Sequence, residues 1–282
     1  MLAFFVNVFF FPFLWGSANI LASARDAPSI LPAGAVGTSA PVRPSKYMDP
    51  ISGTATLEPA LALEQRLYFG EHQVPLWNPD VAFGAPLAAD MVSQPFYPLA
   101  ILASLHPSPT TFAWFVAVRL FAAGFLTFLF LRFFVPFVPA VFGAVAFAFT
   151  GYFILYLTIC HVSVEVLIGA LFYGAEWLLR TRSWRAMVWI AAAVWLVMLG
   201  GMPESALLAV GLSAAYFAFR LLSEPRLRAS WPQLLGRYAG ANLAGVGAAA
   251  FLLLPFVEYL GNSFNTHQFA RGGAFRGLRD VD

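Results

Sequence analysis

The apolar residues of this 282-residue chain are concentrated in long runs that contain few charges. A run of about 20 apolar residues is long enough to cross the hydrocarbon core of a membrane as one helix. Seven segments meet or approach this length: residues 2–24, 111–134, 136–159, 162–179, 186–199, 205–222 and 234–260. The pattern therefore predicts an all-α, polytopic transmembrane helix bundle of about seven spans. The last run is rich in Gly and Ala, which predicts close helix packing.

The first run, residues 1–24, has two interpretations. Ala22-Ser23-Ala24 resembles the small-residue cleavage site of a signal peptide. However, no Lys or Arg precedes the apolar run, as a signal peptide would require. We therefore favour a retained transmembrane helix, and in both interpretations the next segment lies on the far side of the membrane.

A long polar loop, residues 25–110, separates the first run from a six-helix region at 111–260. Residues 27–44 are rich in Ala, Pro, Gly and Ser, which is typical of a flexible tether. Residues 57–69 carry apolar side chains at close to helical period and predict an amphipathic helix on the membrane surface. Residues 96–105 are apolar but too short to span, so we expect a second interfacial or re-entrant helix.

Composition narrows the functional class. Hydrophobic residues make up 60% of the chain and charged residues only 11%. So few charges could not cover a water-exposed surface, which excludes a soluble enzyme and a disordered chain. The single cysteine, Cys160, excludes an internal disulfide and a cysteine-based metal cluster. A net charge of +2 gives no sign of a nucleic-acid partner.

The distribution of arginines predicts the orientation. The short loops of one side contain one acid, Glu224, among seven arginines: Arg132, Arg180, Arg182, Arg185, Arg226, Arg228 and Arg237. The 25–109 segment on the other side has seven acids against four basic residues. By the positive-inside rule, we expect a multi-pass protein of the plasma membrane whose N-terminus is cytoplasmic and whose large loop is extracytoplasmic.

Several polar residues fall at span ends on the side of the large loop: His161, Glu165, Glu204 and Glu258. Charges at membrane depth are costly and usually face a cavity or a partner, so these residues predict an outward-facing acidic cleft beneath the loop. A simpler interpretation is open for each. Glu204 could cap a helix N-terminus, and His161 and Glu258 could be interfacial anchors.

Two charges lie within the predicted spans. Arg119 needs a phosphate, a carboxylate of a neighbouring helix or a path to the surface. We prefer a phosphate, with a carboxylate equally open. Glu176 lies four residues before Arg180, which predicts an ion pair within one helix and no functional role.

The large loop carries the most specific motif of the chain. Its parts are Tyr47-Met48-Asp49-Pro50, Gly70-Glu71-His72-Gln73-Val74-Pro75-Leu76-Trp77-Asn78-Pro79, Phe83-Gly84-Ala85-Pro86-Leu87 and Gln94-Pro95-Phe96-Tyr97-Pro98. This order resembles the YfhO-like bacterial membrane proteins, which are similar to the GT-C glycosyltransferase superfamily. The 200–204 and 254–258 segments also match family positions. Chains of that family are longer, so we interpret residues 261–282 as a polar tail that starts a truncated continuation.

The resemblance implies a function. It implies inverting transfer of a sugar from a polyprenyl-phosphate carrier to an envelope acceptor on the extracytoplasmic side, with Asp49 as the catalytic base. It assigns substrate binding to the outward cleft and loop: Trp77, Asn78, Tyr97, Arg119, His161, Glu204 and Glu258. The leaving phosphate needs a cation, for which Arg119, Arg66 or a divalent metal are candidates, although no ligand spacing demands a metal. Trp77, Phe96 and Tyr97 would stack on a sugar or anchor the loop in membrane lipids, and Asn78 would shape a turn.

Two other functions are open at this point. A transporter or flippase of lipid-linked intermediates would use the same cleft without bond chemistry, and discontinuous helices at mid-membrane would favour it. Thr150-Gly151 is the one candidate break that the pattern offers. A non-catalytic membrane scaffold or fragment is the third possibility.

Overall fold

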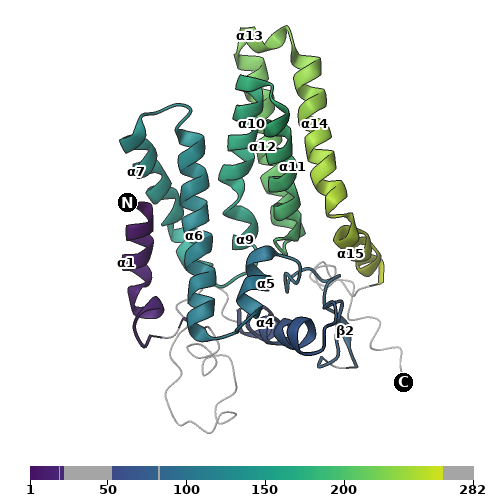
Figure 1. The fold of residues 1–282 in the computed structure, drawn as a ribbon. Helices are drawn as coiled ribbons and strands as arrows, with labels where there is room; N and C mark the ends of the chain where they lie inside the picture. Colours follow the sequence, from purple (N-terminus) through teal and green to yellow (C-terminus); the bar gives the residue numbers. More distant parts are fainter. Residues whose placement is uncertain (19, 22–52, 82, 263–282) are drawn as a thin grey trace, which may run out of the picture.

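The computed structural model describes residues 1–18, 20–21, 53–81 and 83–262. The predicted catalytic Asp49, the 27–44 tether and most of the 261–282 tail lie outside these ranges. The described part is mostly helical with almost no strand, as the sequence predicted (Figure 1). Its strands are the two-residue segments β1 (Trp77–Asn78) and β2 (Ala85–Pro86), which pair antiparallel.

The apolar runs form helices that pass repeatedly between two ends of the bundle (Figure 1). They are α1 (Leu2–Leu14), α6 (Pro109–Leu131), α7 (Phe137–Ala148), α8 (Gly151–Leu155), α9 (Val162–Glu165), α10 (Ile168–Thr181), α11 (Trp184–Leu199), α12 (Pro203–Ser223), α14 (Trp231–Ala248) and α15 (Ala250–Asn262). Within the described ranges, four helical segments are long and apolar enough to cross a membrane: α6, α7 together with α8, α9 together with α10, and α12. The count is five if the bent pair α14 and α15 is one span. The chain thus has the helices of a multi-pass membrane protein, but the predicted count of seven is not confirmed.

The first and last predicted spans differ from their observed form. Helix α1 ends at Leu14, ten residues before the predicted end, and contains Pro12, which lacks a backbone donor. The run 234–260 is not one straight helix, because α14 and α15 meet at an angle of 71°. A Phe96–Phe251 ring contact, with centroids 5.1 Å apart, holds α15 against the polypeptide that precedes α5.

The described part of the large loop, from residue 53 onward, folds into a lobe beneath the bundle (Figure 1). A helix is present where the sequence predicted one, but it buries Glu64 as well as apolar residues inside the protein, and its place on a membrane surface stays a prediction. It runs from the π-helical turn η1 (Gly53–Leu57) through α4 (Glu58–Gln65) to a second π-helical turn, η2 (Arg66–Gly70), and buries Leu57, Leu61 and Leu67. The hairpin of β1 and β2 follows, and then α5 (Pro98–Ser104), the second short helix that the sequence predicted.

Small residues allow the helices to approach closely, as the Gly- and Ala-rich composition predicted. A Cβ atom added to Gly245 of α14 would lie 2.6 Å from the carbonyl oxygen of Ala191 in α11. A Cβ atom added to Gly169 of α10 would lie 2.6 Å from the backbone nitrogen of Thr127 in α6. Side chains at these positions would force the helices apart, so the glycines set the spacing of the bundle.

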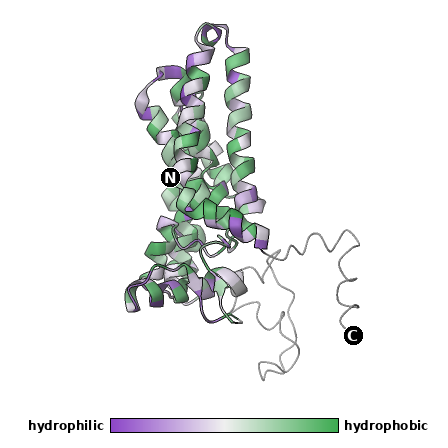
Figure 2. Ribbon diagram, turned by 90° about the vertical axis from the view of Figure 1, so that its right-hand side faces the viewer, coloured by the Kyte–Doolittle hydropathy of each residue, from purple (hydrophilic) through white to green (hydrophobic). Residues whose placement is uncertain are grey.

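The two ends of the bundle differ in charge. The end that carries α13 (Pro225–Arg228), here called the arginine end, brings together the arginines of the three short loops (Figure 1). The opposite end, here called the loop end, carries the lobe with Glu58, Glu71, Asp80 and Asp90. Figure 2 shows hydrophobic residues along the helices between these ends. This distribution is the one that a membrane-crossing bundle requires.

Candidate functional site

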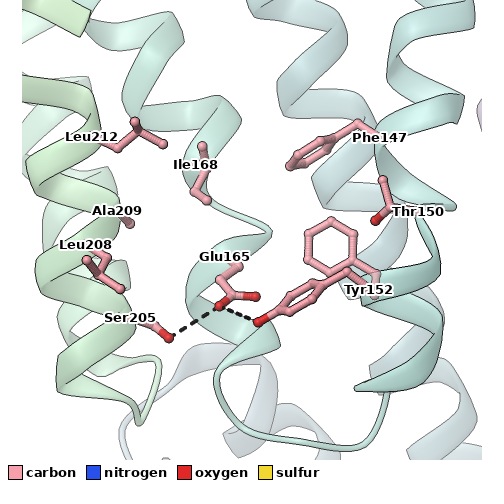
Figure 3. A pocket seen from close by; sticks show the side chains of 10 residues that line it. Phe147, Thr150, Tyr152, Glu165, Ile168, Ser205, Leu208, Ala209 and Leu212 are labelled. Carbon is pink, nitrogen blue, oxygen red and sulfur yellow. Dashed lines mark hydrogen bonds between the residues drawn. The ribbon is translucent and has the colours of Figure 1, made fainter. Parts of the chain in front are cut away.

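A groove of about 330 Å³ opens between the α7–α8 segment and α12, with α9 and α10 at its back. Figure 3 shows that its lining changes along its length. Phe147, Ile168 and Leu212 lie toward one end, and the polar groups of Tyr152, Glu165 and Ser205 lie toward the other. The groove thus joins an apolar channel to a small polar centre.

The polar centre is built around the carboxylate of Glu165. Its Oε1 accepts hydrogen bonds from the Tyr152 hydroxyl at 2.9 Å and from the Ser205 hydroxyl at 3.3 Å. These donors come from α8 and α12, so the carboxylate connects the two walls of the groove (Figure 3). Its second oxygen, Oε2, is buried and has no hydrogen-bond partner.

The groove opens to the side of the bundle. Leu208, in its lining, is 73% exposed, and the neighbouring Leu207 is 74% exposed. Large exposed leucines on a helix that is long and apolar enough to cross a membrane face lipid. A lipid chain could therefore enter the groove laterally.

Two predicted site residues flank this centre. His161 lies one turn before Glu165, and its ring centroid is 5.2 Å from that of Tyr156 and 5.9 Å from that of Tyr152. Glu204 immediately precedes Ser205 in the first turn of α12 and is exposed. The N-cap of α12 is Met202 and there is no side-chain cap bond, so Glu204 lies in the first turn, near the helix N-terminus, but does not cap the helix.

Gln94 holds the two segments that carry the polar centre. Its Nε2 donates to the carbonyl oxygen of Cys160 at 2.9 Å and to that of Gly200 at 2.6 Å, and its Oε1 accepts from Ser163 Oγ at 3.1 Å. Cys160 precedes α9, which carries Glu165, and Gly200 precedes α12, which carries Ser205. The side chain is 1% exposed, so one loop residue fixes both segments inside the protein.

Arg119 has neither of its predicted partners in the described structure. Its Nη2 donates to the carbonyl oxygen of Leu157 at 2.6 Å, and its Nη1 donates to Ile159 O and Ser163 Oγ, each at 3.2 Å. The guanidinium also lies 4.3 Å from the centroid of the Phe115 ring. The residue is 1% exposed, and in the described structure its guanidinium binds the backbone that leads into α9 and no carboxylate; a phosphate partner stays a prediction.

The structure gives the remaining loop residues separate places. Tyr97 is buried, and its hydroxyl lies 3.4 Å from the Ser163 carbonyl oxygen. Trp77, on β1, is 53% exposed, and Asn78 Oδ1 accepts from the Asp80 backbone, which confirms its role in a turn. Neither Trp77 nor Asn78 lines the groove.

Arg66 and Glu258 also lie away from the groove lining. Arg66 Nη2 donates to Asp80 Oδ2 at 2.8 Å, and its Nε lies 3.5 Å from Glu71 Oε1, so two acids already pair with this candidate phosphate ligand. Glu258 is exposed on α15, beyond the bend. The structure thus brings Tyr97, His161 and Glu204 to the segments around the polar centre and leaves Trp77, Asn78 and Glu258 outside it.

The predicted Glu176–Arg180 ion pair is confirmed, with 2.7 Å between Oε1 and Nε. The carboxylate also accepts from the Tyr216 hydroxyl at 2.7 Å and pairs with Arg220 on α12 at 3.1 Å. Glu176 is fully buried, so these partners satisfy a charge inside the bundle near the arginine end. Its role is structural, as expected.

The candidate metal has no donor set in the described part of the chain. No group of three or more His, Cys, Asp or Glu side chains there lies close enough to hold a metal ion. Asp49, which could contribute to such a set, is outside the described residues.

Comparisons with known proteins do not identify a family. No family model matches the chain, and neither a curated protein nor a solved structure matches it. The resemblance to YfhO-like proteins therefore stays a prediction from the loop motif.

Sequence reasoning placed Glu165 at a span end but did not single out Tyr152, Ser205 or Gln94. Tyr152 follows the candidate break at Thr150-Gly151, and Ser205 follows Glu204, so both lay beside features that the sequence had marked. Gln94 is part of the loop motif itself. Its contacts span 66 and 106 residues of sequence, a separation at which no local pattern indicates a partner.

Proposed function

We propose that this chain is a GT-C-type glycosyltransferase that moves a sugar from a polyprenyl-phosphate carrier to an envelope acceptor. The observation that carries the proposal is the Glu165 carboxylate at the polar end of a laterally open, apolar groove. A lipid-linked donor needs a place for its chain at membrane depth and for its headgroup near the surface. The groove offers both within one continuous lining.

We further propose that the loop end faces the extracytoplasmic side of the bacterial plasma membrane. The charge difference between the two ends supports this orientation, because cytoplasmic loops carry the excess of arginines. The lobe of the large loop would then lie over the membrane on the side where polyprenyl-linked sugars are consumed in GT-C reactions.

The proposed reaction is an inverting substitution at the anomeric carbon. The acceptor hydroxyl oxygen forms a bond to that carbon, the bond between the carbon and the phosphate oxygen breaks, and polyprenyl phosphate leaves. The acceptor proton passes to a carboxylate, which is Asp49 by family resemblance. Tyr97, His161 and Glu204 would bind substrate around the polar centre, and Trp77, Asn78 and Glu258 would do so only if the lobe and α15 move toward it.

The test is transfer by the full chain in nanodiscs supplied with a polyprenyl-phosphate sugar labelled in the sugar. We expect release or transfer of the label by the wild type, and its loss in Asp49→Asn while the fold is retained. Glu71→Gln, which removes an exposed acid of the same lobe, is the matched control. Full transfer by Asp49→Asn would show that Asp49 is not the base.

A second candidate, a transporter of lipid-linked intermediates, is supported by interruptions in two neighbouring helices. The break predicted at Thr150-Gly151 is present between α7 and α8, and a second lies between α9 and α10. Both adjoin the groove, as in transporters whose discontinuous helices surround the substrate. Movement of the intact labelled lipid across the liposome membrane, without release of its sugar, would favour transport. The absence of both sugar transfer and lipid movement would favour the scaffold.

A further inference from the structure

Among the described residues, the lining of the groove includes an acid but no basic residue. Glu165 is the carboxylate, and the rest are aliphatic, aromatic or hydroxyl side chains. The nearby Arg119 directs its guanidinium to backbone carbonyls and is buried. An ionised phosphate placed beside Glu165 would therefore meet a like charge and no compensating cation from the described lining residues.

The free oxygen of Glu165 indicates what the ligand must supply. Oε1 already accepts from Tyr152 and Ser205, whereas Oε2 is buried without a donor. A buried acceptor left without a hydrogen bond costs about 1–3 kcal/mol. A ligand in the groove that presents a hydrogen-bond donor to Oε2 recovers this cost.

We propose that the groove selects its lipid by a hydroxyl of the headgroup sugar, which donates to Glu165 Oε2, and not by the phosphate. This inference rests on the proposed function and names the part of the donor that the site recognises. The lipid chain lies toward Phe147, Ile168 and Leu212, and the sugar lies against Tyr152 and Glu165. The phosphate joins the lipid chain to the sugar, so it lies between these two parts and is directed out of the groove, away from the Glu165 carboxylate.

The experiment compares two lipids that differ only in the sugar. Nanodiscs of phosphatidylcholine contain the full chain and a photo-cross-linkable polyprenyl-phosphate glucose, and the unlabelled glucose lipid or bare polyprenyl phosphate competes for labelling. We expect the glucose lipid to compete at about tenfold lower concentration, a difference of about 1.4 kcal/mol. Equal competition by the two lipids would overturn the inference. So would equal competition by phosphatidylethanolamine, whose ammonium is also a donor.

Glu165→Leu makes the test specific. Leucine offers neither an acceptor nor a donor at the position of Oε2, whereas the amide nitrogen of a glutamine could donate to the same sugar hydroxyl, since a hydroxyl both donates and accepts. We expect the preference for the glucose lipid to disappear in Glu165→Leu and to persist in the control Glu71→Gln. A preference unchanged by Glu165→Leu would overturn the inference.

The inference about sugar binding and the glycosyltransferase proposal can be refuted independently of each other. If the preference depends on Glu165 but no sugar is released, the binding site stands and the glycosyltransferase proposal falls. If sugar is transferred but Glu165→Leu keeps the preference, the function stands and the assignment of Glu165 falls.

Discussion

The side-chain amide of Gln94 donates a hydrogen bond of 2.6 Å to the carbonyl oxygen of Gly200, more than a hundred residues away. The same nitrogen also donates to the carbonyl oxygen of Cys160. Because these carbonyls precede α12 and α9, the amide fixes the distance between Ser205 and Glu165. The polar centre of the groove therefore depends on a residue of the loop lobe that does not line it.

Gln94→Leu should destabilise the protein. The substitution removes the donor to the buried Gly200 carbonyl oxygen and the acceptor of the Ser163 hydroxyl, whereas the Cys160 carbonyl oxygen keeps the Ser163 backbone N–H as a donor. Each buried group left unsatisfied costs about 1–3 kcal/mol. We expect a clearly lower midpoint of thermal unfolding in detergent, measured by tryptophan fluorescence. Gln65→Leu, at an exposed position of α4, is the control and should change the midpoint little. A Gln94→Leu midpoint equal to that of the control would mean that the amide does not hold these segments.

Gly201→Ala should be destabilising for two reasons. Gly201 has φ +85°, a conformation that L side chains rarely adopt. A Cβ atom would also lie 2.5 Å from Gln94 Cγ and 2.8 Å from the Met91 carbonyl oxygen. We expect a loss of at least about 1 kcal/mol of unfolding free energy by denaturant titration.

Gly211→Ala is the matched control for Gly201→Ala. Gly211 lies within α12, and an added Cβ atom meets nothing within 4 Å. Alanine favours a helix over glycine by about 0.5–1 kcal/mol, so this variant should be neutral or slightly more stable. Equal effects of the two substitutions on the unfolding free energy would show that the backbone conformation at residue 201 does not require glycine.

Sequence periodicity was sufficient for the features that depend on neighbouring residues. It predicted the amphipathic helix over 57–69, the short helix near 96–105, the break at Thr150-Gly151 and the Glu176–Arg180 pair. Each of these follows from spacing within a few turns of one helix. The bend between α14 and α15 was missed, because an uninterrupted apolar run has the same pattern whether it is straight or bent.

The partners of buried polar groups could not be predicted in the same way. Arg119 raised the question of a partner, but its acceptors are backbone carbonyl oxygens, which every residue has and no sequence pattern marks. For the same reason, nothing in the loop motif indicated that Gln94 would bind Cys160 and Gly200. These contacts depend on how the helices meet in space.

Arg119→Lys should lower stability although the charge is retained. The guanidinium reaches Leu157, Ile159 and Ser163 with separate donors, whereas a lysine ammonium is a compact group that cannot match this planar arrangement. We expect a loss of at least about 2 kcal/mol in unfolding free energy, measured by denaturant titration. Arg132→Lys, at the arginine end, should be close to neutral. A near-neutral Arg119→Lys would argue that the guanidinium is replaceable by any cation.

Among the described carboxyl groups of the lobe, that of Glu64 has the largest pKa shift. It lies on α4 with no exposed surface, and neither of its oxygens has a hydrogen-bond partner. Burial raises its pKa from 4.5 to about 8. The folded protein therefore holds this group in its neutral form at pH 7, beside Tyr68, whose pKa burial raises to about 12.

Glu64 should make stability fall as pH rises from about 4.5 to about 8. In this range the unfolded chain has lost the proton that the folded chain keeps, so folding binds a proton and higher pH opposes it. Glu64→Gln removes the titration, and its gain in thermal midpoint over the wild type should be larger at pH 8.5 than at pH 5. Burial also raises the pKa of Asp90 to about 6, but that contribution is present in both proteins and cancels in the difference. The control is Gln65→Glu, which adds an exposed carboxylate next to Glu64 and should show no such pH-dependent difference in thermal midpoint. An equal gain for Glu64→Gln at both pH values would contradict a neutral, buried Glu64.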